Sequence, residues 1–329
     1  METRRRPLLL AAGALLAERL GHAQQPQRMR RIGFLSPQSD TARRRQWWRE
    51  GLLRAGYAEG RNLLIEWRFA EGQIGCMPGL ADELVRLNVE LIVTDANTST
   101  DAARQVTQTI PIVMVWNVFP VERGLIKSLA RPGGNVTGTV RTADPNEYFV
   151  KTWQILRDAV PKASRATILN NGADPILRFY DDAIGDQQAK EMGFISVQRI
   201  SITRPNEITS SLDLVLSSRP DVLIVGAHVT EFGAFPEIAA FALERKLVSH
   251  SDSDRYVVAG GLLSYGPHID SLRDLTGNYV DKILRGAKPA DLPVQQTLKW
   301  NMVLNAKTAH AIGFKPPPAF KLQVTHEIE

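Results

Sequence analysis

Ile32-Gly33-Phe34-Leu35-Ser36 and Leu91-Ile92-Val93 are apolar runs that open and close a βαβαβ pattern in residues 31–100. Between them the sequence predicts a helix that closes at Gly56, a strand over residues 64–69 and a second helix. Apolar runs of this kind are typical of parallel strands that helices cover on both faces. Residues 31–100 therefore predict one doubly wound α/β unit.

The same order of elements returns in residues 165–230. A strand over residues 166–169 precedes a helix that closes at Gly193, a strand over residues 196–200 and another helix, and the apolar run 222–225 follows. Two units in matching phase predict two similar lobes with a cleft between them. Because open parallel sheets bind ligands beyond the carboxyl ends of their strands, two such edges facing one cleft predict a receptor-like site.

The boundary between the lobes carries a helix-start signal. Asp144 supplies a capping side chain, Pro145 suits the first helical position, and Glu147 follows three residues after Asp144. We therefore expect the first lobe over residues 30–140 and the second over residues 141–264.

The remaining segments need a place in this scheme. Residues 265–294 contain an amphipathic helix, and residues 300–329 begin with a short apolar strand. We expect both segments to pack back near the first lobe and the hinge region. The chain would then cross between the lobes near residues 139–143, 262–266 and 294–299, which predicts a three-stranded hinge that closes on ligand.

The N-terminus has the layout of a secretory signal peptide over residues 1–23. A basic start precedes an apolar stretch over residues 8–17, and small residues precede the expected cleavage after Ala23. Glu18 and Arg19 interrupt the pattern, so a cytoplasmic amphipathic extension is the alternative. The stretch is too short to span a bilayer, and no later segment is long and apolar enough. We expect a periplasmic protein without a membrane span in its mature chain.

Composition is that of an ordinary globular protein, with 43% hydrophobic residues and a net charge of +5. Cys76 is the one cysteine, so the chain has no internal disulfide and no lipid-acceptor cysteine after the apolar stretch. The densest basic run, Arg43-Arg44-Arg45 beside Trp47-Trp48, is interpreted as a solvated helix face rather than a nucleic-acid site. We expect a monomer with no nucleic-acid partner.

Several ordered segments resemble the periplasmic substrate-binding components of ABC transporters, most of all the tryptophan/tyrosine-type receptors. They include residues 32–37 (IGFLSP), 128–138 (SLARPGGNVTG), 260–267 (GGLLSYGP), 279–284 (YVDKIL) and 286–294 (GAKPADLPV), with Asn305 and residues 307–309. The resemblance covers residues 30–329. It implies the type I periplasmic binding protein fold, a small-molecule ligand, an ABC transporter permease as partner, and no cofactor or metal.

The chain departs from this family in two loops. Members commonly have a Gly-Gly-Thr-Pro-like loop where this chain has residues 95–100 (DANTST), and a Gly-Asp-Pro-Val-like loop where it has residues 116–121 (WNVFPV). Both loops fall where the first lobe should face the cleft. The resemblance therefore implies the scaffold and leaves the ligand open.

The first lobe offers five candidate ligand-binding residues at two strand ends. Asn97, Thr98 and Ser99 lie between a buried strand and a helix, where backbone N–H groups and hydroxyls favour an anion or carboxylate. Simple helix capping by Thr98 or Ser99 is the alternative. Ser36 and Pro37 end the first strand at the same edge, where an ordinary turn is the alternative.

Trp116 and Asn117 are two further candidates at the end of the next strand. Trp116 would stack on a planar ligand, and Asn117 would add a donor and an acceptor. Packing of Trp116 under a loop is the alternative.

In the second lobe the candidates are Asn171, His228 and Asp252. The six histidines show no metal-ligand spacing, so His228 is interpreted as a neutral hydrogen-bond partner or a solvated loop residue. The related branched-chain amino-acid receptors place an acidic residue near the position of Asp252. If the ligand is an amino acid, Asp252 would pair with its ammonium while the Thr98 and Ser99 amides hold its carboxylate. A surface aspartate is the alternative.

No catalytic motif is present: the sequence lacks a Gly-x-Ser-x-Gly elbow, a phosphate loop and a His-Glu-x-x-His pair. We expect a solute receptor that closes on a small ligand and presents it to a permease, with an amino acid or a related small carboxylate as the candidate ligand class. A ligand-sensing accessory receptor and a periplasmic enzyme are the alternatives. A transcription regulator of the same fold would carry a helix-turn-helix where this chain has an export signal.

Overall fold

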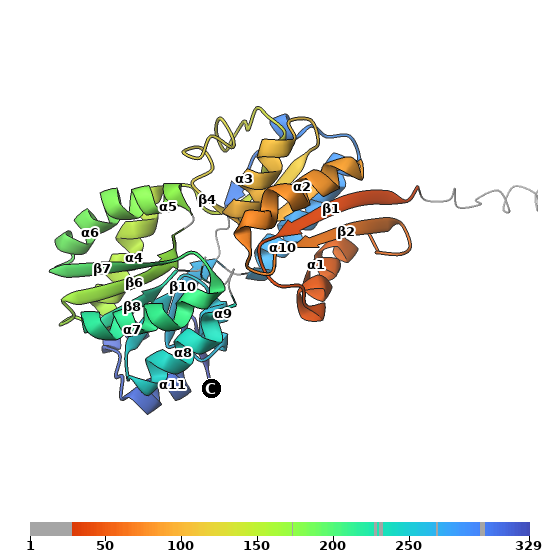
Figure 1. Ribbon diagram of the computed structural model, residues 1–329. Coiled ribbons are helices and arrows are strands. Elements are labelled where there is room, and N and C mark those ends of the chain that lie inside the picture. The colour runs from red at the N-terminus through yellow and green to blue at the C-terminus, as the bar shows by residue number, and fades with distance from the viewer. Residues whose placement is uncertain (1–27, 173, 227–228, 230–232, 268, 297–299) are drawn as a thin grey trace, which may run out of the picture.

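The computed structural model describes residues 28–329 except residues 173, 227–228, 230–232, 268 and 297–299. These residues form two lobes, each built on one sheet with helices around it (Figure 1). The expected signal peptide lies outside the described residues. None of the described helices has the length and apolar character that crossing a membrane requires.

The first lobe contains a six-stranded sheet with the strand order β11-β5-β4-β3-β1-β2, in which all pairs are parallel. Its strands are β1 (Arg30–Ser36), β2 (Leu63–Phe69), β3 (Ile92–Asp95), β4 (Ile112–Val118), β5 (Val136–Thr142) and β11 (Gln295–Gln296). Its helices are α1 (Ala42–Arg54), α2 (Met77–Arg86), α3 (Asn97–Val106) and α10 (Ile269–Leu284).

Successive side chains along the strands of this sheet point to opposite faces, and each face packs against its own layer of helices. In β1, Phe34 packs with α1 and α10, whereas the next residue, Leu35, packs with α2 and α3 on the opposite face. Val113 and Met114 divide in the same way in β4. Both faces are thus buried, which is why these strands read as nearly continuous apolar runs.

The second lobe contains a seven-stranded sheet with the order β13-β12-β10-β9-β8-β6-β7, parallel except between β10 and β12. Its strands are β6 (Arg165–Asn171), β7 (Ser196–Ile202), β8 (Val222–Val225), β9 (Val248–Ser251), β10 (Leu263–Pro267), β12 (Trp300–Asn305) and β13 (His326–Ile328). Its helices are α4 (Pro145–Ala159), α5 (Pro175–Tyr180), α6 (Asp186–Glu191), α7 (Ile208–Ser218), α8 (Phe235–Glu244), α9 (Asp254–Val258), α11 (Ala306–Ile312) and α12 (Pro318–Lys321).

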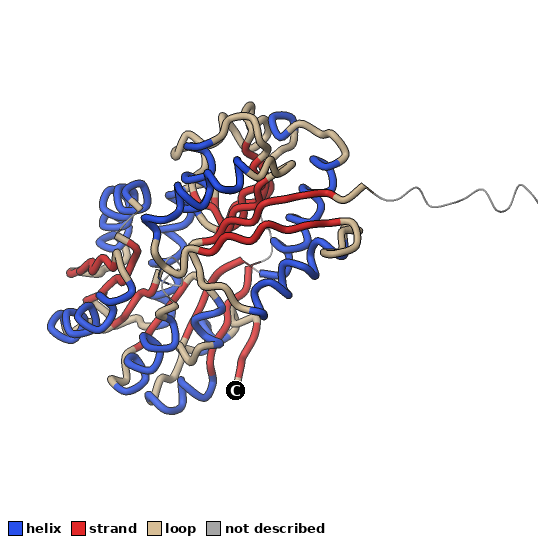
Figure 2. Tube along the Cα trace, turned by 45° about the vertical axis from the view of Figure 1, so that its right-hand side comes forward, coloured by secondary structure: helices blue, strands red, loops and turns tan. Residues whose placement is uncertain are grey.

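Helices again lie on both sides of the strands in this lobe (Figure 2). Leu223 packs with α7 and α8, while the adjacent Ile224 packs with α4 and α6. The predicted start of α4 is confirmed, because the Asp144 side chain accepts a hydrogen bond from the backbone N–H of Asn146 over 2.8 Å. This cap satisfies one of the backbone N–H groups that would otherwise be unpaired at the start of α4.

The C-terminal segment corrects one expectation. Residues 300–329 do not pack back on the first lobe, because β12 pairs with β10 in antiparallel register and β13 pairs with β12. Met302, Leu304 and Phe320 share a core with Leu263 and the C-terminal half of α4. The segment instead covers an open edge of the second sheet, where it buries apolar side chains and satisfies the hydrogen bonds of β10.

Helix α10, by contrast, packs on the first lobe beside α1, with Leu272, Tyr279 and Val280 in the same core as Trp48. The chain therefore passes between the lobes three times: between β5 and α4, between β10 and α10, and between β11 and β12. This connectivity joins the two sheets whose edges form the candidate site.

His250 on β9 gives the second lobe a testable pH dependence. Its imidazole is 1% exposed, and neither ring nitrogen has a hydrogen-bond partner among the described residues. Burial lowers the pKa of His250 to about 4, against a smaller opposing effect of Asp252. The folded protein therefore keeps a neutral ring at pH values where an unfolded chain already binds a proton.

As the pH falls from about 6.5 to about 4, His250 should lower the free energy of unfolding by up to about 1.4 kcal/mol per pH unit. Urea denaturation at pH 7 and pH 5 measures this slope. His250→Leu should show a shallower slope than wild type over this window. An equal slope in both proteins would show that the ring does not control the pH dependence.

Candidate functional site

The candidate site lies where the carboxyl edges of the two sheets face each other. Strands β1, β3 and β4 end there in the first lobe, and β6, β8 and β9 end there in the second. Side chains join the two edges directly. Arg141 contacts Asp252, Arg255 contacts Gln38, and Arg123 contacts Asp174. The lobes are thus in contact across the cleft.

Ser36 and Pro37 form the turn after β1 and are both buried. The Ser36 hydroxyl donates to Oδ2 of Asp95 over 3.2 Å and accepts from the backbone N–H of Gln38 over 3.2 Å. Burial raises the pKa of the Asp95 carboxyl, although the charges of Arg255 and Arg44 oppose this effect. In this structure Ser36 therefore holds the turn and orients Asp95.

Asn97, Thr98 and Ser99 form the first turn of α3, and their side chains have different roles. The Ser99 hydroxyl donates to the carbonyl of Ala96 over 2.9 Å. Asn97 accepts from the backbone N–H of Val118 over 3.0 Å and donates to Asp174 over 3.1 Å. Thr98 differs from both, because its buried Oγ1 has no hydrogen-bond partner among the described residues.

Trp116 and Asn117 lie together at the end of β4, where the register with β5 is irregular. Asn117 donates through Nδ2 to Thr100 over 2.9 Å, while its buried Oδ1 has no partner in the described part of the chain. The same holds for Nε1 of Trp116. The Trp116 ring lies near two cations, with Cζ of Arg255 at 5.7 Å and Cζ of Arg141 at 6.0 Å from its centroid.

Backbone strain concentrates at the same edge. Ala96 has φ 99° and ψ 167°, a region that glycine normally occupies, and Trp116 and Phe119 have φ 66° and 54°. Each such conformation costs about 1–3 kcal/mol and persists only where the surrounding structure enforces it. The three strained residues and the unpartnered polar atoms occupy the two loops in which the chain departs from the resembling receptors. Backbone strain and unpartnered polar atoms therefore coincide at this edge of the first lobe.

Asp252 lies in the cleft, not on the surface. It is 5% exposed, forms an ion pair with Arg141 of the first lobe, and accepts a hydrogen bond from the Tyr148 hydroxyl over 2.8 Å. Arg141 also donates to the Asp252 carbonyl over 2.7 Å. Burial, and then the charge of Asp252, raises the pKa of Tyr148 well above its usual value, so its hydroxyl stays a donor.

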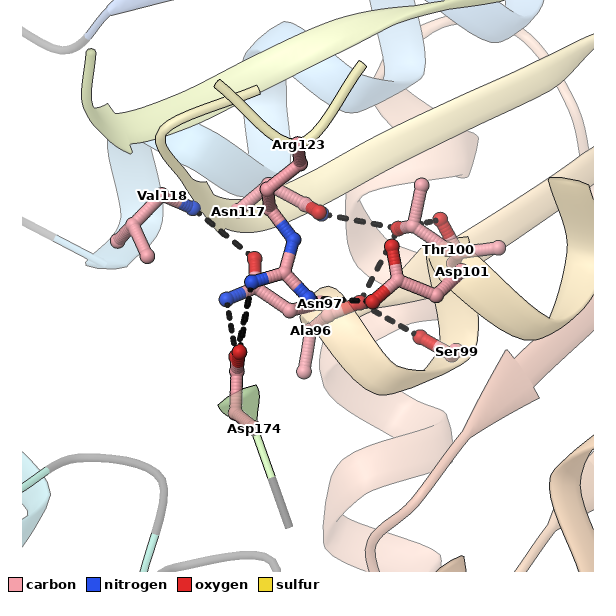
Figure 3. Close-up of polar contacts among 10 residues, drawn as sticks. Ala96, Asn97, Ser99, Thr100, Asp101, Asn117, Val118, Arg123 and Asp174 are labelled. Carbon is pink, nitrogen blue, oxygen red and sulfur yellow. Dashed lines mark hydrogen bonds and ion pairs between the residues drawn. The ribbon is translucent and has the colours of Figure 1, made fainter. Parts of the chain in front are cut away.

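A second polar bridge between the lobes, which we call the clasp, consists of Arg123, Asp174, Asn97 and Asp101 (Figure 3). Nη1 of Arg123 donates to both carboxylate oxygens of Asp174, over 2.8 and 3.0 Å, and Arg123 also pairs with Asp101. The Arg123 and Asp174 side chains are 2% and 1% exposed. Because both side chains are buried, removing either charge would leave the other without a counter-charge in a site shielded from water.

The two other second-lobe candidates are less fully described. Asn171 ends β6, but its side chain lies outside the described part of the structure, and His228 lies there entirely. The neighbouring Asn170 donates to Asp181 over 3.1 Å. Among the described residues, no group of three or more His, Cys, Asp or Glu side chains could hold a metal ion.

Sequence reasoning missed Arg141, Tyr148, Arg123 and Asp174. Two of them carried a usable signal. Arg141 is a charged residue in the otherwise uncharged strand β5, and Asp174-Pro175 repeats the Asp-Pro helix start seen before α4. Neither pattern reveals its partner, because the contacts join residues 51 to 111 positions apart.

The Arg141–Asp252 pair predicts a specific result in a double-mutant cycle. Asp252→Ala should destabilise the protein by about 3–5 kcal/mol, because it leaves the Arg141 guanidinium buried without its counter-charge. Adding Arg141→Met should restore much of that loss, since both charges are then absent. Chemical denaturation measures the free energy of unfolding of the wild type, the two single variants and the double variant. Additive losses in the double variant would contradict the pairing.

Comparisons with known proteins agree with this architecture. The profile of the family described as ABC transporter substrate binding protein matches residues 34–319. A tyrosine-binding protein of Clostridioides difficile is 26% identical over 273 residues, which are 81% of this chain and 76% of that protein.

Two solved structures share the fold. The ABC domain in complex with L-Trp from Streptococcus pneumonia has 24% identity and a TM-score of 0.79, covering 91% of this chain and 100% of that one. The ligand-free, open structure of a substrate binding protein with adhesive properties from Clostridium difficile has 25% identity and a TM-score of 0.61, covering 91% and 99%.

Two doubly wound lobes joined by three chain passages are the type I periplasmic binding protein fold, which confirms the expected fold class. The family match spans most of the chain and includes both edges of the cleft. The chain therefore belongs to the ABC transporter substrate binding protein family.

Proposed function

We propose that this protein is the solute receptor of an ABC importer, which captures a small ligand by closure of its lobes and delivers it to a membrane permease. The main support is a set of three buried polar atoms at the first-lobe edge that have no hydrogen-bond partner among the described residues: Thr98 Oγ1, Trp116 Nε1 and Asn117 Oδ1. Buried polar atoms normally have partners, so three orphans together indicate groups that a ligand satisfies. In keeping with the expected signal peptide, the receptor would act in the periplasm.

The relatives suggest the class of ligand. One is named a tyrosine-binding protein and another was solved with L-Trp. In this chain the Trp116 ring is the surface on which a planar side chain would stack, and the start of α3 offers N–H groups to a carboxylate. The site would thus accept an aromatic amino acid or a related small carboxylate.

Asp252 remains the proposed partner of a ligand ammonium, under a constraint that the structure adds. Its carboxylate already accepts from Arg141 and Tyr148. An ammonium would therefore share a carboxylate that is engaged with a cation, which weakens the attraction compared with a free carboxylate. Ligands without an ammonium are accordingly part of the proposed class.

Closure by ligand follows from the bridges between the lobes. A ligand shifts the equilibrium only by as much as it binds the closed state better than the open one. The clasp and the Arg141–Asp252 pair stabilise the closed arrangement before any ligand contributes. The ligand then needs to supply only the remaining difference in free energy.

A thermal-shift screen of the purified protein tests the receptor function. Aromatic amino acids, other amino acids, small carboxylates, purines and sugars are the compounds to compare. A ligand at 100 times its Kd should add about 2.7 kcal/mol to the free energy of unfolding. Thr98→Val should then weaken binding roughly tenfold without lowering the stability of the free protein, since Oγ1 has no internal partner.

Ser99→Ala is the matched control in the same turn. It removes a hydroxyl that bonds Ala96 and so should lower stability slightly while ligand affinity stays unchanged. A screen in which no compound raises the melting temperature would contradict the receptor function. Equal affinities of wild type and Thr98→Val would remove Thr98 from the site.

The clasp predicts a change in the open population. Asp174→Asn removes the counter-charge of Arg123, so the fraction of open molecules should rise and the apparent ligand affinity should fall roughly tenfold or more. Small-angle scattering measures the first effect as a larger radius of gyration without ligand. Asp213→Asn, an exposed carboxylate of the same lobe, is the control. An unchanged radius and affinity would show that the clasp does not bias closure.

A further inference from the structure

Two arginines from opposite lobes meet on one oxygen atom at the cleft. Arg44 extends from α1 of the first lobe and Arg255 from α9 of the second. Both donate to Oε1 of Gln38, Arg44 through Nη2 and Arg255 through Nη1, the latter over 3.3 Å. Gln38 is 4% exposed, so the meeting point is shielded from water. We call these two residues the arginine pair.

The arginine pair lacks the compensation that the other cleft arginines have. Arg141 pairs with Asp252, and Arg123 pairs with two aspartates. Within the described ranges, neither Arg44 nor Arg255 forms an ion pair; besides Gln38, Arg44 donates to the carbonyl of Ser39. The basic run of α1 is therefore not wholly a solvated face, since Arg44 turns inward.

The carboxyl group that acts on both cations is buried and holds neither of them in an ion pair. Asp95 accepts from Ser36, and burial raises its pKa, although the charges of Arg255 and Arg44 oppose this effect. Burial lowers the pKa of Arg44; the charge of Asp95 opposes this effect, whereas the like charge of Arg255 adds to it. Two like-charged guanidinium groups therefore meet at the amide oxygen of Gln38, and neither has a carboxylate in direct contact within the described ranges.

The surroundings are rich in donors. A guanidinium carries five N–H groups, and the contacts above use only part of them. Trp116, whose ring faces Arg255, adds an unpartnered Nε1–H, and Nε of Arg141 is likewise unpartnered among the described residues. A negatively charged group with several acceptor oxygens would accept hydrogen bonds from these donors and would also pair with the two guanidinium charges.

We propose that the arginine pair binds an oxyanion of the ligand, a carboxylate or a phosphate, and that the ligand is a planar organic anion with net negative charge. This proposal rests on the proposed receptor function and specifies its ligand. The anion bridges the two lobes, because one arginine comes from each. It also removes the repulsion between the two cations, so closure depends on the bound charge.

Four probes separate the ligand classes: indole-3-acetate (an anion), L-tryptophan (a zwitterion), tryptamine (a cation) and inorganic phosphate. Indole-3-acetate should bind at least tenfold more tightly than L-tryptophan, and tryptamine should not bind. Thermal shift and calorimetry measure these affinities. Phosphate alone should raise the melting temperature if the ligand carries a phosphate, whereas a response to indole-3-acetate alone assigns a carboxylate.

Arg44→Gln and Arg255→Gln should each weaken the binding of the anionic probe by roughly tenfold or more. The free variants should be at least as stable as wild type, because each loses one of two repelling cations; a structural role alone would lower stability. Arg43→Gln, an exposed neighbour on α1, should change neither quantity.

Tight binding of L-tryptophan that both variants retain would overturn the role of the arginine pair while leaving the receptor function intact. Binding of neutral sugars or purines alone would have the same meaning. If no probe and no compound of the screen binds, both proposals fail together.

Discussion

The buried ion pair between Arg141 and Asp252 is the interaction on which the arrangement of the two lobes depends. Arg141 is the penultimate residue of β5 in the first sheet, and Asp252 follows β9 of the second. The two charges are 3% and 6% exposed, so neither is screened by water. Because an isolated charge at this depth is costly, the pair constrains both sheet edges to one relative position beside the hinge. Tyr148, from the helix that follows the first crossing, completes this contact.

With the sheet edges placed in this way, some polar groups of the cleft have an ion-pair or hydrogen-bond partner within the protein and others do not. The clasp neutralises Arg123 with Asp174 and Asp101, and Asn97 completes it. The arginine pair forms no ion pair within the described ranges, and the orphan atoms of Thr98, Trp116 and Asn117 have no hydrogen-bond partner there. The ion-paired groups connect the two lobes, and the remaining groups are those that we propose to contact the ligand. The strained residues Ala96 and Trp116 lie beside the orphan atoms of Thr98 and Asn117 in the chain.

Much of the architecture could be predicted from the chain itself. The apolar runs and the two βαβαβ patterns predicted both sheets, and Asp144-Pro145 predicted the start of α4. Strand ends predicted the cleft edge, including the loops around Asn97 and Trp116. Residues 300–329 were misplaced, because a short apolar strand fits the edge of either sheet. Only the antiparallel pairing with β10 selects the second lobe.

What the sequence by itself determined is therefore the set of elements and the sheet edges that carry the candidate site, since hydrophobic periodicity, helix caps and strand ends are local properties of the chain. The tertiary structure alone decided which charges are paired. The chain suggested that Asp252 has a free carboxylate, whereas the fold places Arg141 beside it from 111 positions away in the sequence. Arg44 was interpreted as part of a solvated run, whereas the fold turns it toward Gln38. Electrostatic compensation depends on distance and burial, and neither is encoded in a residue's neighbours along the sequence.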